Sequence, residues 1–106
     1  MDEEEQPVMN DEQKRIYEEK IKNLKIRTAS VIEMLKGTYY PGHSTTAKRV
    51  IERHLIREFG LKPREATYHG GMVIDSLHQK GIIEHVPVDT ARNALFKVNL
   101  RVLQKA

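Results

Sequence analysis

The fold of this chain is decided by residues 47–86, which read AKRVIERHLIREFGLKPREATYHGGMVIDSLHQKGIIEHV. Side chains of its first part recur at helical spacing and predict an inward stripe of Ala47, Val50, Ile51, His54, Leu55 and Phe59. Gly60 suits the left-handed residue that ends a helix, and Pro63 suits the first turn of the next one. The inward stripe of that next helix is Ala66, Gly70, Val73, Ile74 and Leu77. The pattern therefore predicts two helices joined by a very short turn.

Glycine and hydroxyl residues add local detail to these two helices. Ser44, Thr45 and Thr46 precede the first one and predict a hydroxyl cap at its start. Gly70 lies on the inward stripe of the second, where a missing side chain allows close helix packing. The alternatives are that Gly71 lets a backbone or a sugar-phosphate edge approach, or that the helix kinks or begins at Gly71. Lys80-Gly81 ends the second helix.

The periodicity then changes from helical to alternating. Residues 82–86 predict a short strand, and residues 94–100 predict a second one with Ala94, Phe96, Val98 and Leu100 on one face. The polar turn formers of residues 87–93 lie between them. The sequence therefore predicts a β-hairpin after the helices.

A long helix is predicted ahead of this region, from Asp11 to Gly37. One face of it carries apolar spacing: Tyr17, Ile21, Leu24, Thr28, Val31 and Leu35. Such a length leaves two interpretations open. The helix breaks near residues 27–30, with Thr28 or Ser30 capping a second piece, or its first half projects and pairs with another chain.

Charge is distributed unevenly along the 106 residues. Residues 1–13 hold six acids and no Lys or Arg, which leaves 18 basic and 9 acidic side chains in the rest, a net charge of +9. A body with this charge attracts polyanions, and residues 1–10 resemble a disordered acidic tail that offers a site for a protein partner. The absence of cysteine excludes disulfides and thiolate chemistry. No apolar run is long enough to span a membrane, so we expect no membrane association and a cytoplasmic, DNA-associated location.

The order helix, helix, short turn, helix, β-hairpin resembles the winged-helix branch of the helix-turn-helix proteins. The residues that carry the likeness are 50–61 (VIERHLIREFGL) and 73–83 (VIDSLHQKGII), the latter similar to the family's L-x-x-K-G-L-I ending of the recognition helix. The resemblance implies an α+β, mostly helical fold over residues 11–106, with three helices and a two-stranded wing. It also implies a recognition helix in the major groove of double-stranded DNA.

The resemblance places the DNA contacts on three segments. Base or phosphate contacts fall on the third helix and its approach, phosphate contacts on the start of the second helix, and wing contacts on the hairpin loop. The candidate DNA-binding residues are Ser44, Thr45, Thr46, Lys48, Arg49, Lys62, Arg64, Thr67, Tyr68, His69, Arg92 and Asn93.

A homodimer is the expected assembly, because one short recognition helix contacts few base pairs. The candidate dimer residues are Tyr17, Ile21 and Leu24 of the first helix, with Val102 and Leu103 near the C-terminus. The alternative is that the first helix covers the core of its own subunit.

Catalysis finds no support in the sequence, which lacks a nucleophile elbow, a phosphate-binding glycine loop and a paired set of acids. The five histidines are not spaced as metal ligands, so no cofactor is expected. We expect a non-enzymatic DNA-binding protein acting as a small transcriptional repressor or as a plasmid or virus partition adaptor. A winged-helix protein-interaction module and an RNA- or ribosome-associated protein are the alternatives.

Overall fold

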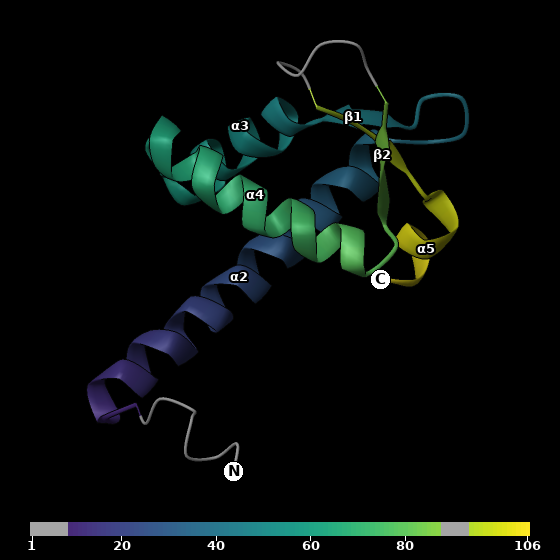
Figure 1. Cartoon of the computed structure of the whole chain (residues 1–106). Coiled ribbons are helices and arrows are strands. Elements are labelled where there is room, and N and C mark those ends of the chain that lie inside the picture. Colours follow the sequence, from purple (N-terminus) through teal and green to yellow (C-terminus); the bar gives the residue numbers. More distant parts are fainter. Residues whose placement is uncertain (1–8, 88–93) are drawn as a thin grey trace.

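The computed structural model describes residues 9–87 and 94–106 of the chain (Figure 1). Its elements are α2 (Asp11–Thr38), β1 (Thr45–Ala47), α3 (Lys48–Phe59), α4 (Pro63–Gln79), β2 (Ile83–Val86), β3 (Leu95–Val98) and α5 (Leu100–Lys105). The predicted class, α+β and mostly helical, is confirmed. Residues 1–8 of the predicted acidic tail and residues 88–93 of the predicted loop, including Arg92 and Asn93, lie outside the described residues, so the predictions made for them stay predictions.

The sheet has three antiparallel strands in the order β1-β3-β2, one more than the sequence predicted. The hairpin is confirmed, with His85 opposite Phe96, and the added strand pairs Thr46 with the other side of Phe96. This pairing corrects the predicted hydroxyl cap of α3. Residues 45–47 are held extended by β3, so the N-cap is Ala47, which has no side-chain hydrogen bond. The backbone amide of Lys48 instead donates to the carbonyl of Ala94 at 3.1 Å.

The core lies where α2, α3 and α4 meet the inner face of the sheet. The inward stripe of α4 is buried as predicted, and Gly60 is left-handed with φ of 65°. Gly70 lies against α3, since a Cβ there would lie 3.2 Å from Glu52 Cγ. The predicted close packing at this glycine is confirmed, whereas a Cβ on Gly71 would meet nothing within 4 Å. The core residues are Val31, Leu35, Tyr39, Ile51, Leu55, Val73, Ile74, Leu77, Ile82, Ile83, Phe96, Val98 and Leu103.

Helix α2 is one piece of 28 residues, so the predicted alternative of a break near residues 27–30 is wrong. A capping box starts the helix: the Asn10 side chain accepts from the Gln13 amide, and the Gln13 side chain accepts from the Asn10 amide. Ser30 caps no second helix because its hydroxyl lies 2.8 Å from His54 Nε2 on α3. The C-terminal half packs on the core, and the N-terminal half projects from the body (Figure 1).

The C-terminal segment differs from the prediction. The Asn99 side chain accepts from the Val102 amide at 3.3 Å and starts α5, which ends the strand before Leu100. Leu103 is only 2% exposed in the core of its own chain, and Val102 packs against that core. Assigning Leu103 to a dimer contact is therefore wrong, and Val102 serves the same intramolecular packing.

The contact between Ser30 and His54 ties α2 to α3 inside the molecule. His54 is 7% exposed, and its Nδ1 is buried without a hydrogen-bond partner. Burial lowers the pKa of His54 from its ordinary 6.5, an effect that Arg57 supports and that Glu58 and a backbone hydrogen bond with Ser30 oppose. The core histidine that the sequence predicted is confirmed.

Stability is expected to fall as the pH drops below about 6.5, because the unfolded chain then binds a proton that the folded chain resists. The loss continues until the pH passes the lowered pKa of folded His54, with a slope of at most about 1.4 kcal/mol for each pH unit. Urea unfolding at several pH values between 7.5 and 5 measures it. His54→Gln should flatten this dependence, and an unchanged slope in that variant would contradict the assignment. His69→Gln is measured in the same way, because the pKa of His69 is also lowered, chiefly by burial.

Candidate nucleic-acid interface

The N-terminal half of α4 presents a polar face to the surface. Tyr68 is 66% exposed there, and Arg64 and Thr67 are exposed beside it. Glu65 is turned back to the helix end, where its Oε1 accepts from the Lys62 amide at 2.8 Å. This carboxylate therefore caps the helix and leaves Arg64 as the charged group of the outward face.

Thr67 and Tyr68 bring two hydroxyl groups to this face, and each side chain has a neighbour on α4. The Thr67 hydroxyl donates to the carbonyl of Pro63 at 3.1 Å, so its free oxygen lone pairs remain as acceptors. The Tyr68 ring makes an edge contact with the His69 ring, with centroids 5.1 Å apart. The His69 ring therefore covers one side of the Tyr68 ring, and the rest of the Tyr68 side chain is accessible to a ligand.

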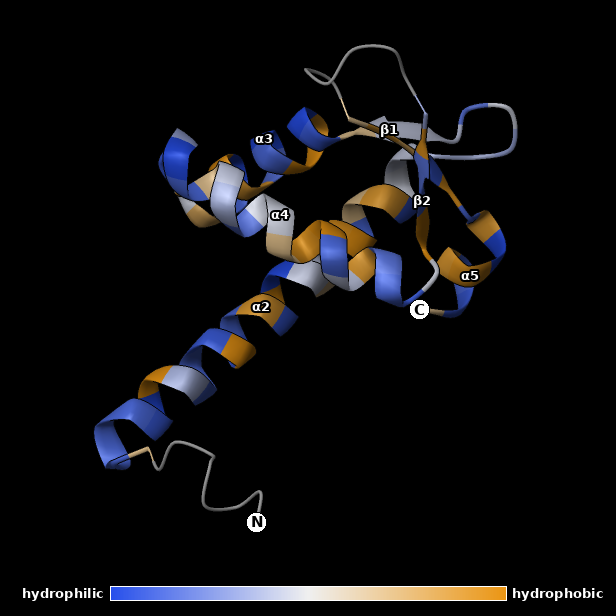
Figure 2. Cartoon of the chain, viewed as in Figure 1, coloured by the Kyte–Doolittle hydropathy of each residue, from blue (hydrophilic) through white to orange (hydrophobic). Residues whose placement is uncertain are grey.

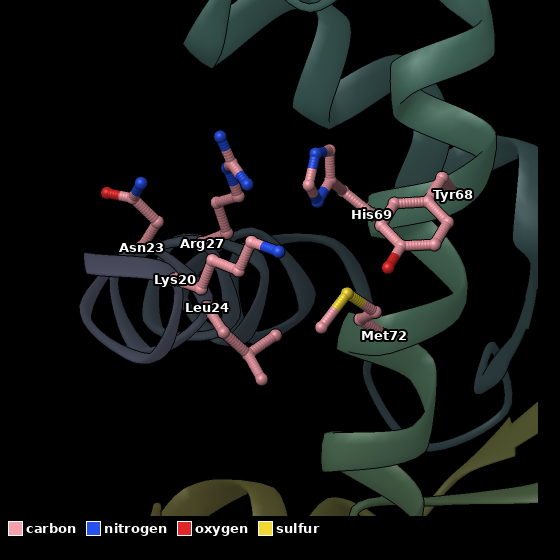
Figure 3. Close-up of a pocket in the computed structure, with 7 residues that line it drawn as sticks. All are labelled: Lys20, Asn23, Leu24, Arg27, Tyr68, His69 and Met72. Carbon is pink, nitrogen blue, oxygen red and sulfur yellow. The ribbon is translucent and has the colours of Figure 1, made fainter. Parts of the chain in front are cut away.

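A groove of about 190 Å³ runs between α4 and α2 (Figure 3). From α4 it is lined by Tyr68, His69 and Met72, and from α2 by Lys20, Asn23, Leu24 and Arg27. Figure 3 shows the Lys20 side chain extending from α2 toward α4, with the Arg27 side chain near His69. His69 is half-buried at this groove, so it faces α2 more than the open surface.

The electrostatics of the groove are positive. None of its lining residues is acidic, and within the described part of the chain Lys20 and Arg27 join no ion pair within 4.0 Å. The pKa of His69 is lowered by burial first and then by the charge of Arg27, with Glu65 opposing. Arg27 also lies 6.0 Å from the centre of the Phe59 ring. The groove thus offers cations to an anionic ligand.

Sequence reasoning missed these α2 cations as functional residues. The signal was present, since residues 20–27 read KIKNLKIR and hold four Lys or Arg and no acid. The apolar spacing of the same segment is the stronger pattern, and it predicts a dimer contact there. Only the crossing of α2 behind α4 shows that Lys20 and Arg27 flank the predicted recognition helix.

The candidates at the start of α3 lie in several environments. Thr45 and Arg49 are exposed, and Lys48 lies 3.9 Å from the Glu52 carboxylate. Ser44 is half-buried in the sheet region, with its carbonyl accepting from the Val98 amide at 2.7 Å. Thr46 is 3% exposed, so its hydroxyl cannot reach a phosphate and its assignment to the interface is wrong.

The candidate residues at the start of α3 lie far from the α2–α4 groove. Lys48 and Arg49 lie one helix length away from Lys62 and Arg64, because α3 runs its 12 residues between them. That distance is about 18 Å at 1.5 Å per residue. The described residues therefore carry two positive regions, one at the α2–α4 groove and one at the start of α3.

Residues 9–87 and 94–106 carry neither a metal-binding cluster nor a membrane-spanning helix. These residues contain no group of three or more His, Asp or Glu side chains placed to hold a metal ion. No helix among them is both long enough and apolar enough to cross a membrane. Neither a family model, nor a curated protein, nor a solved structure matches this chain.

Proposed function

We propose that this chain is a non-enzymatic, sequence-preferring double-stranded DNA-binding protein with a winged-helix fold. Its order of elements supports this proposal, since α3, a three-residue turn and α4 precede the β2–β3 hairpin, and α2 packs behind them. In that fold α4 is the recognition helix and the β2–β3 hairpin is the wing. The β1 strand fits the same arrangement because it joins the hairpin to the start of α3.

The observation that carries the proposal is the acid-free, cationic groove beside the exposed N-terminal half of α4. The major groove of B-DNA is about 12 Å wide and admits one helix, with a phosphate backbone on each side. With α4 in that position, Lys20 and Arg27 meet one backbone and the start of α3 meets the other. Arg49 is the exposed cation at that second contact.

Base reading falls on the outward face of α4. The Arg64 guanidinium is exposed and presents two parallel N–H donors that match the O6 and N7 acceptors of guanine. Tyr68 offers an apolar ring edge to a thymine methyl and a hydroxyl to a phosphate. Phosphate contacts by the flanking cations position this face, and they carry no base preference themselves.

The biological role that we propose is that of a small transcriptional repressor or a partition adaptor of a plasmid or virus. Both roles need a compact protein that occupies DNA without performing chemistry on it. Neither role requires a cofactor.

The test is a salt-dependent gel shift on duplex DNA, preceded by selection of preferred sequences from a random duplex pool. Affinity should fall steeply with salt, because bound phosphates release counterions. Arg64→Ala should weaken binding to the preferred site by about 10- to 100-fold and relax the preference at one base position. Arg101→Ala on α5 is the matched control and should leave both unchanged.

Structured RNA and a protein partner are the outcomes that would overturn the proposal. If the chain binds structured RNA as tightly as duplex DNA or more tightly in the same assay, the cationic groove is an RNA-binding site. A chain that binds no nucleic acid at low salt would leave the surface of α4 to a protein ligand. An unchanged base preference in Arg64→Ala would remove α4 from the role of recognition helix.

A further inference from the structure

The projecting half of α2 leaves apolar side chains uncovered. Five of the seven large apolar side chains that are exposed in the described residues lie between Met9 and Ile26. Tyr17 is 53% exposed and Ile21 is 38% exposed, although they lie on the same helix face as the buried Val31 and Leu35. Figure 2 shows apolar bands continuing along α2 beyond the body of the molecule. The apolar face of the core thus extends into solvent.

A helix half that packs against nothing is marginal in water, since most helical stability in proteins comes from burying an apolar face. We infer that the stripe formed by the exposed Tyr17 and Ile21 and the half-buried Leu24 binds a second copy of this chain. The two projecting halves pack antiparallel about a two-fold axis, with Tyr17 of each copy against Ile21 of the other. This inference does not depend on the proposed function, because it concerns a different face of α2.

Charge along α2 selects the antiparallel arrangement. Residues 11–19 hold four acids and two bases, whereas residues 20–27 hold four bases and no acid. An antiparallel pair places each acidic start beside the basic segment of the other copy. A parallel pair would place the two basic segments side by side, where like charges repel. A two-fold axis makes the favourable contact occur twice.

The base of the projecting half provides the place where the acidic start of the partner docks. An open groove of about 400 Å³ lies there, lined by Ile21, Leu24, Lys25, Thr28, Ala29, Ile32, Ser76 and Lys80. Its floor is mostly apolar, and Lys25 of α2 and Lys80 after α4 are its charged residues. With Tyr17 against Ile21, a rise of about 1.5 Å per residue in both helices sets the partner's first turn beside residues 24–27. Asp11 of that turn lies on the same flank of the apolar stripe as Lys25, so the Asp11 carboxylate then lies near Lys25 of the other copy.

The dimer leaves the proposed DNA groove open. Lys25 lies on one flank of the apolar stripe, whereas Lys20 and Arg27 lie on the opposite flank at helical spacing. The two grooves accordingly share only Leu24 among their lining residues. A second copy can therefore cover the stripe while the α2–α4 groove remains free.

The experiment measures the mass of the full chain in solution without DNA, by sedimentation equilibrium over the micromolar range. We expect a dimer for the natural sequence. Ile21→Glu should raise the dimer dissociation constant by about a hundredfold, because both copies then place a carboxylate in the apolar contact. Ile26→Glu is the matched control: Ile26 is exposed on the opposite face of α2, so the same substitution there should leave the dimer intact. Circular dichroism verifies that both variants remain folded.

Orientation is tested by charge exchange. Asp11→Lys should weaken the dimer, and so should Lys25→Glu. The two substitutions combined should restore it, because the opposite charges then meet again. A monomeric natural chain, or an intact dimer in Ile21→Glu, would overturn the inference, and no rescue by the double variant would overturn the antiparallel arrangement. A monomer that still shifts duplex DNA would leave the proposed function standing.

Discussion

The double substitution Lys20→Glu with Arg27→Glu is expected to reduce DNA affinity by about 100-fold or more at low salt. Each cation lines the groove beside α4, and each neutralises one phosphate in the proposed complex. Losing two phosphate contacts should also lower the slope of log affinity against log salt by about two. A titration of fluorescent duplex at several salt concentrations measures both quantities. The base preference should stay the same, since phosphate contacts carry no sequence information.

The matched control is Arg101→Glu with Lys105→Glu, which changes the net charge by the same amount on α5. That variant should lose only the small part of the affinity that comes from the overall field of the protein. Equal losses in the two variants would show that net charge alone drives binding. Full affinity in the groove variant would show that DNA does not reach the α2–α4 groove.

The variant Leu55→Ala is expected to lower the free energy of unfolding by about 2–5 kcal/mol. Leu55 is fully buried on α3, and its Cδ1 lies 3.9 Å from the position of a Cβ on Gly70. Truncation therefore opens a cavity at the contact that sets the position of α4. A domain of this size is stabilised by only about 5–15 kcal/mol, so the loss is a large part of the total.

Urea unfolding followed by circular dichroism measures this loss. Ile26→Ala is the control, since Ile26 is 47% exposed and its truncation should change stability by about 0.5 kcal/mol or less. A loss below about 1 kcal/mol in Leu55→Ala would show that the α3–α4 contact closes around the smaller side chain. DNA affinity measured well below the unfolding midpoint should change little, because Leu55 faces the core.

Local sequence rules were sufficient to predict the bounds of α3 and α4 at the turn between them. Gly60 and Pro63 mark the end of α3 and the start of α4, because each restricts the backbone without help from distant residues. The buried face of α4 followed from apolar spacing in the same way. The packing role of Gly70 was also predictable, since it lies on that inward stripe.

The errors have a common physical cause, which is pairing with residues far along the chain. Three residues before α3 became strand β1 because the β3 backbone pairs with them, which no local pattern records. The same pairing buries Thr46 and removes it from the surface. The sequence predicts a dimer contact at Leu103, because it does not show that α5 folds back onto the core.

The residues of the candidate site also fall into a predictable group and an unpredictable one. The exposed residues of α4, such as Arg64 and Tyr68, were predictable from position on one helix. Lys20 and Arg27 were not, because they lie some 40 residues earlier and reach the site only through the crossing of two helices.

By itself, the sequence determined helices α2, α3 and α4, the hairpin, the faces that turn inward and the positive charge of the body, since these depend on neighbours within a few residues. Only the tertiary structure decided which cations flank α4, which hydroxyls are buried and how far α2 projects. Those properties depend on contacts between distant segments, which form when the apolar faces of several elements are buried together.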